Sequence, residues 1–386
     1  MYMKEDFILF AKKIFDDDFI PLHRPIFNGN ERKYLVDCID SNFVSSVGAK
    51  VNEFENGIAK FTNCNHAIAT VNGTSALHIA IKLSGVKEGD EVLTQALTFI
   101  ATCNAISYTG AKPVFIDVDK DTMGMSPDAL LGFLKNHTEK RNGNTYNIKT
   151  RKKIRACVPM HTFGNPCRIE KISSICKAWG ISLIEDCAES LGSYVGEKHT
   201  GNFGDMAIFS FNGNKLITTG GGGMIVTNDA NLAKRAKHLT TTAKVAHEYE
   251  FIHDEIGYNY RMPNINAALG CAQMEKIDKF LIKKRMLANT WKKFFEPYNV
   301  DFHSESDGNK INYWLNTIIF ESRDLRDEFL EYTNANNVMT RPIWKLMTSL
   351  KMFSDCQHDG LKNSKWLEDR VVNIPSSVPQ IDNIKV

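Results

Sequence analysis

HAIATVNGTSALHIAIKLSGVKEGDEVLTQALTFIATCNAISYTGAKPVFIDV, residues 66–118, alternates between two kinds of apolar pattern. Short runs rich in Val and Ile are typical of buried strands, whereas apolar residues that recur every three or four positions are typical of helices. The strand-like runs are 66–71, 91–96 and 113–118, and the helix-like stretches are 75–85 and 99–110. Because the two kinds alternate, we predict an α/β fold with a mostly parallel sheet that carries helices on both faces.

The same alternation continues beyond this stretch. Ser126 as N-cap and Pro127 at the first helical position predict the start of a helix. The basic segment 137–153 nearly lacks interleaved aromatic residues, which favours a solvated surface loop over a nucleic-acid-binding patch. Further buried strands are predicted at 155–160, 181–187, 205–211 and 222–228.

A long helical pattern, residues 264–295, follows Pro263 and is long enough to bridge two domains. After it, 312–320 is predicted as a strand and 322–336 as a helix. We therefore predict a large domain over residues 1–262, which includes an N-terminal helical segment. The linking helix and a smaller C-terminal α/β domain occupy residues 263–386.

The composition excludes several classes of protein. The 386 residues include 47 basic and 45 acidic side chains, a formal net charge of +2, so no general nucleic-acid-binding surface is indicated. The nine cysteines are odd in number and scattered, which favours a reducing cytoplasm over a disulfide framework. Residues 1–19 lack a signal-like apolar core, and no apolar stretch approaches the ~20 residues that cross a bilayer. We expect a soluble cytoplasmic protein without membrane insertion.

The turn after the first strand has the features of a phosphate site. Asn72 and Gly73 end the strand, and Thr74 and Ser75 open the helix, whose first N–H groups have no partner within the helix. Such a helix start binds phosphate well. An ordinary Ser or Thr cap is the alternative.

Asp186 ends the predicted strand 181–187, at the edge where open α/β sheets bind ligands. A carboxylate in this place can keep the nitrogen of a pyridine ring protonated, as pyridoxal chemistry requires. The alternative is a structural Asp that caps the following turn.

Lys215 lies in a polar turn between two strands, shortly before four consecutive glycines at 220–223. Glycines are unfavourable in such a run unless the backbone must pass close to another group. A partly desolvated amine there can attack an aldehyde, and Ser210 could place its hydroxyl on the same phosphate. A merely exposed lysine is the alternative.

These residues belong to a longer pattern that resembles the DegT/DnrJ/EryC1/StrS family of fold-type I sugar aminotransferases. The matching stretches occur in consistent order over roughly residues 23–290: SNFVSSVGAKVNEFE, NGTSALHIAI, ALTFIATCNAISYTGAKPVFIDVD, HTFGNP, LIEDCAESLGSYVGEKHTGNFGDMAIFSF and GYNYRMPNINAALG. The resemblance implies pyridoxal 5′-phosphate as cofactor, with pyridoxamine 5′-phosphate as its intermediate form. L-Glutamate and a nucleotide sugar are the implied substrates.

The resemblance also implies a role for each matching residue. Lys215 is the catalytic lysine that holds the cofactor as a Schiff base, Asp186 faces the ring nitrogen, and Glu189 faces the ring hydroxyl. Phe99 stacks on the ring, with a core phenylalanine as the alternative. The phosphate ligands implied are Gly73, Thr74, Ser75 and Ser210.

The GYNYR segment resembles a loop that reaches into the other subunit's active site, which implies a homodimer. Asn259 would touch the partner's phosphate, and Arg261 is a candidate substrate contact for which a structural ion pair is the alternative. His161 is a further candidate contact with cofactor or sugar, with a structural histidine as the alternative. Cys157, His161 and Cys167 match no zinc spacing, so we expect no metal.

The FNGNK lead-in to Lys215 departs from the Phe-His-x-x-Lys form of many members. It resembles the branch that aminates UDP-2-acetamido-2,6-dideoxy-4-ketohexoses in bacillosamine and legionaminic acid pathways, as does RPIWK, which adds Arg341 and Trp344 as substrate contacts. We therefore predict amino transfer from L-glutamate to C4 of such a sugar, for lipopolysaccharide or glycan biosynthesis. The alternatives are a GDP- or dTDP-linked keto sugar, or a regulatory protein that binds the cofactor without turnover. Dehydratase relatives carry histidine in place of the lysine.

Overall fold

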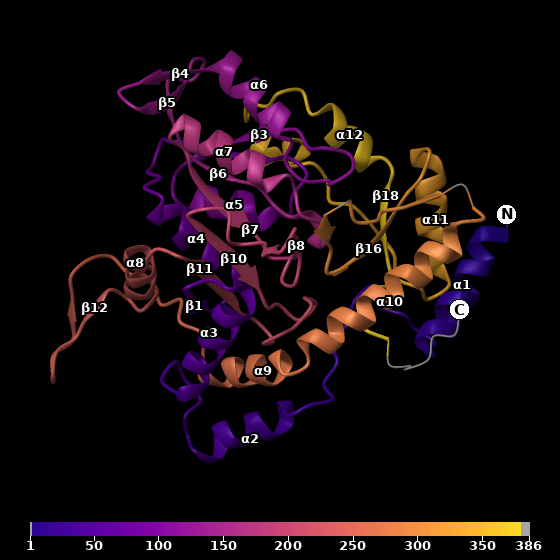
Figure 1. Ribbon diagram of the computed structural model, residues 1–386, viewed down its shortest axis with the longest axis horizontal. Coiled ribbons are helices and arrows are strands. Elements are labelled where there is room, and N and C mark those ends of the chain that lie inside the picture. Colours follow the sequence, from indigo (N-terminus) through magenta and orange to yellow (C-terminus); the bar gives the residue numbers. More distant parts are fainter. Residues whose placement is uncertain (1, 299, 307, 380–386) are drawn as a thin grey trace.

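The computed structural model describes residues 2–298, 300–306 and 308–379 (Figure 1). Its centre is a nine-stranded sheet, in which seven strands follow the order β1-β11-β10-β7-β6-β2-β3 and the hairpin β4–β5 is added through β6. The strands from β10 to β3 are parallel, while β11 is antiparallel to both its neighbours. The bounds are β1 (His66–Thr70), β2 (Glu91–Gln95), β3 (Lys112–Ile116), β4 (Thr138–Arg141), β5 (Asn144–Asn147), β6 (Lys153–Val158), β7 (Ser182–Asp186), β10 (Met206–Ser210) and β11 (Gly223–Thr227).

Helices cover both faces of this sheet, as predicted. Adjacent residues of one strand point to opposite faces, so Ile68 packs in the cluster formed with α4, α5 and α8, while Ala69 packs in the cluster with α3 and α9. Leu183 and Ile184 divide in the same way, with Leu183 facing α6 and α7. The helices of this half are α2 (Glu31–Asp40), α3 (Ala49–Thr62), α4 (Gly73–Leu83), α5 (Ile100–Tyr108), α6 (Pro127–His137), α7 (Ile169–Trp179), α8 (Ala230–Thr240) and α9 (Asn264–Met274).

The basic segment 137–153 is a β-hairpin rather than the predicted loop. Strands β4 and β5 pair antiparallel, and β5 continues the large sheet through β6. Asn142 and Gly143 at its tip both have positive φ, 49° and 75°. An Asn-Gly pair with this conformation is a strong hairpin signal, so the sequence contained the information that the loop prediction missed.

A smaller antiparallel sheet, of order β14-β16-β18-β17, forms the second half of the molecule (Figure 1). The predicted strand 312–320 begins only at Asn316, because Tyr313 adopts a left-handed φ of 50° and turns the chain. The elements of this half are β14 (Asp301–Phe302), β16 (Asn316–Ile319), α11 (Arg323–Ala335), β17 (Arg341–Pro342), α12 (Lys362–Glu368) and β18 (Val371–Ile374). Short remaining pieces are β8 (Tyr194–Val195), β9 (Lys198–His199), β12 (Lys244–Val245), β13 (Ile252–His253) and β15 (Asn309–Lys310), with 3-10 turns at 162–164, 347–349 and 351–353.

The helical pattern at 264–295 forms two helices instead of one. α9 ends at Met274, and α10 (Ile277–Phe295) then runs from the large sheet to the small one (Figure 1). At the break, the Glu275 carboxylate accepts hydrogen bonds from Asn30 and Tyr34 beside α2. The division of the chain near residue 263 stays a prediction. None of the helices within the described residues is long and apolar enough to span a membrane.

The N-terminal helix α1 (Tyr2–Phe15) packs with the second half rather than with the large sheet. Phe7 is fully buried, and its ring centroid lies 5.1 Å from that of Trp291 in α10 and 5.0 Å from that of Phe329 in α11. Aromatic side chains bury large apolar areas and dominate the energy of such clusters. The helical segment placed in the large domain by sequence therefore contributes its apolar face to the core of the small half.

We predict that Phe7→Ala lowers the free energy of unfolding by about 3–5 kcal/mol, because it leaves a cavity among four aromatic rings. Leu9→Ala in the same helix is the matched control, since Leu9 is 68% exposed. Urea unfolding followed by circular dichroism measures both. Equal shifts of the two midpoints would contradict the packing of α1 described above.

Candidate functional site

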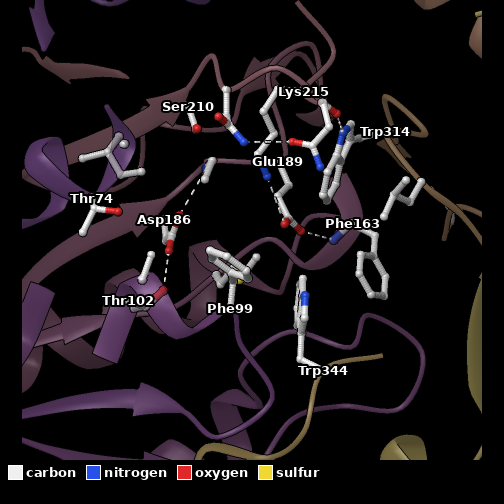
Figure 2. A pocket seen from close by; sticks show the side chains of 18 of the residues that line it. Thr74, Phe99, Thr102, Phe163, Asp186, Glu189, Ser210, Lys215, Trp314 and Trp344 are labelled. Atoms are coloured by element: carbon white, nitrogen blue, oxygen red, sulfur yellow. Dashed lines mark hydrogen bonds and ion pairs between the residues drawn. The ribbon is translucent and has the colours of Figure 1, made fainter. Parts of the chain in front are cut away.

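A cavity of about 450 Å³ lies where the carboxyl ends of β7 and β10 meet the N-terminus of α4 and the edge of the small half. Figure 2 shows Thr74 and Asp186 on one side of it, Trp314 and Phe163 on the other, and Lys215 between them. The structure brings together these sequence-predicted residues at its wall: Gly73, Thr74, Phe99, Asp186, Glu189, Ser210, Lys215, Arg341 and Trp344. Ser75, His161, Asn259 and Arg261 do not line it.

The N-terminus of α4 is built for close backbone approach. Its cap is Asn72, whose side chain accepts a 2.8 Å hydrogen bond from the Ser75 N–H, so neither Thr74 nor Ser75 is the cap. A Cβ at Gly73 would lie 3.0 Å from the Cβ of Ser210, and one at Gly223 would lie 2.4 Å from the Asn72 carbonyl oxygen. Glycine is thus required where β10 and β11 pass the helix start, which accounts for part of the glycine run. Thr74 and Ser210 remain in the cavity wall beside the free N–H groups of the first helical turn.

Asp186 ends β7 with a carboxylate that is almost fully buried. Its Oδ2 accepts a 2.7 Å hydrogen bond from the Thr102 hydroxyl, and its Oδ1 accepts one of 3.1 Å from the Ala188 N–H. Burial raises the pKa of Asp186, and the Thr102 hydrogen bond opposes this effect. A cation facing the carboxylate from the cavity would therefore stabilise its ionised form.

Lys215 and Glu189 form an ion pair in the cavity, with Nζ 3.2 Å from Oε1. The other carboxylate oxygen, Oε2, accepts a 2.9 Å hydrogen bond from the Phe163 N–H. Burial raises the pKa of Glu189 to about 7, although the Lys215 charge acts in the opposite direction. The Lys215 Nζ also lies 3.8 Å from the ring centroid of Trp314.

Aromatic rings form one wall of the cavity. Phe99 is 49% exposed, so it is not a core residue, and its ring lies 6.2 Å from that of Trp344. Trp344 in turn lies 4.9 Å from Phe163. The predicted role of Phe99 against a planar ring is compatible with this position beside Asp186 (Figure 2).

His161 is a structural residue, contrary to the prediction of a substrate contact. Its ring is fully buried, with Nδ1 accepting the Cys167 N–H at 3.2 Å and Nε2 3.2 Å from Glu185 Oε2. His161, Glu185 and Cys187 place potential metal-ligand atoms within 4.8 Å of one another. The Glu185 oxygens, however, already accept the N–H groups of Gly201, Phe203 and Gly204, so we assign this cluster to holding the loop 201–204.

Asn259 and Arg261 are exposed and lie outside the cavity of their own chain. Their segment forms isolated bridges with Thr241 and Thr70. The predicted contact of Asn259 with a partner's phosphate stays a prediction. Ser75 is buried in the first turn of α4, and only its N–H is seen to bond at the helix start.

Thr102, Phe163 and Trp314 are among the residues of the cavity wall that the sequence did not single out. Thr102 follows Phe99 by one helical turn, and the motif HTFGNP contains Phe163, so their neighbours offered a signal. Trp314 offered none, because it lies 100 positions after Asn214, to which it hydrogen-bonds.

The site fits pyridoxal phosphate in its chemistry. A helix N-terminus with two hydroxyl side chains suits a phosphate, a buried carboxylate with a raised pKa suits a ring N–H⁺, and Lys215 supplies the amine for an aldehyde. These groups line one cavity. Thr74, Ser210, Asp186 and Lys215 are the residues that would hold the cofactor.

Comparison with known proteins gives a matching family. The model of the DegT/DnrJ/EryC1/StrS aminotransferase family matches residues 25–383. GDP-perosamine synthase of Escherichia coli O157:H7 is 38% identical over 370 residues, covering 95% of this chain and 96% of the relative. GDP-perosamine synthase of Vibrio cholerae is 36% identical over 360 residues, covering 92% and 94%. The crystal structure of a DegT DnrJ EryC1 StrS aminotransferase from Brucella abortus covers 90% of both chains at 25% identity, with a TM-score of 0.81.

The raised pKa of Glu189 predicts a specific pH dependence of stability in the cofactor-free protein. The folded chain keeps a proton on Glu189 up to pH about 7, whereas the unfolded chain releases it near pH 4.5. The associated stability is complete below pH 4.5 and is lost as the pH rises to 7. Glu189→Gln has no group that titrates at this position. Between pH 4.5 and 7 the free energy of unfolding of the variant, measured relative to that of wild type, should therefore rise by about 3 kcal/mol.

Urea unfolding at a series of pH values measures this difference. The exposed Glu197→Gln is the control and should show a constant difference from wild type. A Glu189→Gln difference that does not change between pH 4.5 and 7 would show that Glu189 ionises normally in the folded protein.

Proposed function

Because the chain belongs to the DegT/DnrJ/EryC1/StrS aminotransferase family, we propose that it transfers the amino group of L-glutamate to C4 of a GDP-linked 4-keto-6-deoxy sugar. Membership of the family makes the protein a pyridoxal-phosphate-dependent aminotransferase that acts on a nucleotide-linked sugar. The observation that supports the chemistry is the Lys215 amine, held by Glu189 in a cavity that also contains Asp186.

The choice of GDP replaces the UDP-linked, N-acetylated sugar that the FNGNK motif favoured. Similarity to two GDP-perosamine synthases over more than nine-tenths of the chain supports it. The structure explains why the FNGNK motif does not identify the nucleotide. Asn212 and Asn214 lie beside Lys215, and the Asn214 carbonyl accepts the indole N–H of Trp314. FNGNK therefore shapes the surroundings of the amine and is a weak guide to the nucleotide.

When bound, pyridoxal phosphate supplies an electron sink that allows an amino acid to lose its α-proton. Lys215 takes that proton at Nζ and returns it later. Glu189 keeps Nζ in place through the 3.2 Å contact. Asp186 would keep the ring nitrogen protonated, while Thr74, Ser210 and the first N–H groups of α4 would hold the phosphate.

The small half supplies the proposed contacts with the sugar nucleotide. Arg341 and Trp344 line the cavity from this half. The Arg341 Nη1 donates a 2.8 Å hydrogen bond to Asn334 Oδ1, which fixes the guanidinium at the exposed mouth of the cavity. A fixed, exposed guanidinium suits a carboxylate or phosphate of the substrates.

We also propose that the enzyme is a homodimer in which Asn259 reaches the partner's phosphate.

Two other functions make different use of the same cavity. A dehydratase of this family would carry histidine where the chain has Lys215. The net charge of only +2 gives no support to a regulatory protein that binds nucleic acid as well as the cofactor. Turnover with glutamate separates the aminotransferase from both.

The first test concerns Lys215. Borohydride treatment of the cofactor-loaded wild type should leave a stable pyridoxyl group on the tryptic peptide that contains Lys215. Lys215→Ala should carry no such group and lose about 10²- to 10⁴-fold in rate, because proton transfer lacks its acid and base. Mass spectrometry and a glutamate assay measure both. The exposed Lys198→Ala is the control, and modification of another lysine in wild type would overturn the assignment.

The second test concerns the nucleotide. Purified enzyme with glutamate is incubated with GDP-, UDP- and dTDP-linked 4-keto-6-deoxy sugars, including the UDP-2-acetamido form, and amine formation is followed by mass spectrometry. We expect kcat/KM to be at least about tenfold higher for the GDP-linked sugar, a difference of about 1.4 kcal/mol in transition-state binding. Preference for the UDP-linked sugar would contradict the proposal. No product from any sugar with cofactor bound would favour the regulatory alternative.

A further inference from the structure

Trp314 is the aromatic residue nearest to the reacting nitrogen for which sequence analysis gave no role. The Lys215 Nζ lies 3.8 Å from the centroid of its ring, and Glu189 Oε1 contacts the same nitrogen at 3.2 Å. The Lys215 side chain is only 13% exposed. A cation close to the face of tryptophan is attracted by the ring's quadrupole, more strongly where water is excluded. The ring and the carboxylate together form a seat for the ε-amino group (Figure 2).

Three hydrogen bonds fix Trp314 in this position. Its indole Nε1–H donates to the Asn214 carbonyl at 2.7 Å, and its backbone N–H donates to Asn312 Oδ1 at 2.8 Å. Its carbonyl accepts a 3.0 Å hydrogen bond from Lys284, which is fully buried. The two backbone hydrogen bonds fix the turn, and the indole hydrogen bond fixes the plane of the ring beside Lys215.

The turn that carries Trp314 is strained and tied to the catalytic loop. Tyr313 has a φ of 50°, in the left-handed region that bulky residues avoid. Asn312 donates through Nδ2 to the carbonyls of Glu189 at 2.8 Å and Leu191 at 2.9 Å. Strained backbone persists where surrounding contacts over-determine it, often at functional sites. The strained turn therefore links Trp314 directly to the loop that positions Glu189.

Two other tryptophans show what distinguishes this one. Trp291 is fully buried, donates its indole N–H to the Pro375 carbonyl, and packs among phenylalanines. Trp366 has the Lys120 Nζ 4.0 Å above its ring, away from the cavity. Trp314 combines core burial with a cation contact, and its cation is the proposed acid and base.

We propose that Trp314 is a further catalytic residue, whose indole face seats the Lys215 ε-amino group whenever that group is not joined to the cofactor. The inference rests on the proposed aminotransferase function. In that state Lys215 takes a proton at Nζ from the donor's α-carbon, the electron pair of the broken C–H bond staying on the substrate side, and later returns it. The ring face stabilises the ammonium ion formed in the first transfer and limits the positions that Nζ can adopt. The Glu189 carboxylate, 3.2 Å from Nζ, balances its charge.

The test compares Trp314→Leu and Trp314→Phe with wild type and with the control Trp366→Leu. We expect Trp314→Leu to lower kcat for amine formation about 2- to 30-fold, the range of such a cation contact, with KM changed less than about twofold. Trp314→Phe should fall between, because it keeps a ring face. Trp366→Leu should retain the wild-type kcat.

A second readout needs no turnover. In the cofactor-free protein, limiting reductive methylation followed by peptide mass spectrometry reports the accessibility of each lysine. Trp314→Leu should raise the labelling of Lys215 several-fold while leaving that of Lys120 unchanged. A rise of equal size at the buried Lys284 would indicate general loosening and would overturn the proposal. Unchanged kcat together with unchanged Lys215 labelling would also overturn it.

A third arm avoids the risk that Trp314→Leu fails to fold. Protein grown with fluorinated tryptophans keeps the shape of each ring but has less electron density on its face, which weakens the cation contact. We expect kcat to fall with increasing fluorination in the wild-type sequence and to fall clearly less in Trp314→Phe grown in the same way, which keeps Trp344 in the cavity wall. An equal decrease of kcat with fluorination in the two proteins would contradict the proposal. If wild type aminates no sugar, the proposed function fails, while Lys215 labelling still decides whether Trp314 forms the seat.

Discussion

An ammonium group and a carboxylate meet at 3.2 Å inside the cavity, where water screens neither of them well. Removing two charges from water is unfavourable unless they are paired and their other hydrogen-bonding positions are filled. The molecule supports Glu189 and Lys215 from two separate regions, the turn at Phe163 and the turn 312–314. Phe163 supplies an N–H to the carboxylate, Asn312 holds the Glu189 carbonyl, and Trp314 covers the amine. The raised pKa of Glu189 indicates how strongly burial still acts on this pair.

Local sequence patterns predicted most of the large sheet because its strands are short and buried on both faces. Such strands consist of Val, Ile and other apolar residues whatever their neighbours are, so β1, β2, β7 and β10 could be recognised singly. Residues fixed by tertiary contacts could not be predicted in this way. The turn at Tyr313 depends on Asn312 reaching two carbonyls more than 100 positions earlier, and the sequence around it reads as a continuous strand.

In the candidate site, too, some residues could be predicted from local sequence and others depend on tertiary contacts. Asp186, Lys215 and Gly73 stand at element ends, which the sequence marks through strand patterns, a glycine run and a helix start. His161 also follows a strand, but its ring turns away from the cavity toward Glu185, and only the packing of the loop 201–204 reveals this. The end of a strand thus identifies candidate residues, while the direction of each side chain depends on partners distant in sequence.

A segment that follows α1 and the segment that follows β18 meet beside the cavity, so the small half contributes to the wall of the candidate site. The Leu22 carbonyl accepts the Ser376 N–H at 2.7 Å, and both Leu22 and Asn373 line the cavity. Lys284 in α10 joins the carbonyls of Ser376 and Trp314. The residues proposed to hold the cofactor come from the large sheet and the start of α4, whereas Arg341 and Trp344, the proposed substrate contacts, come from the small half. The sequence near Lys215 therefore indicates the type of reaction. Residues that distinguish the substrates of different relatives should be sought in the small half.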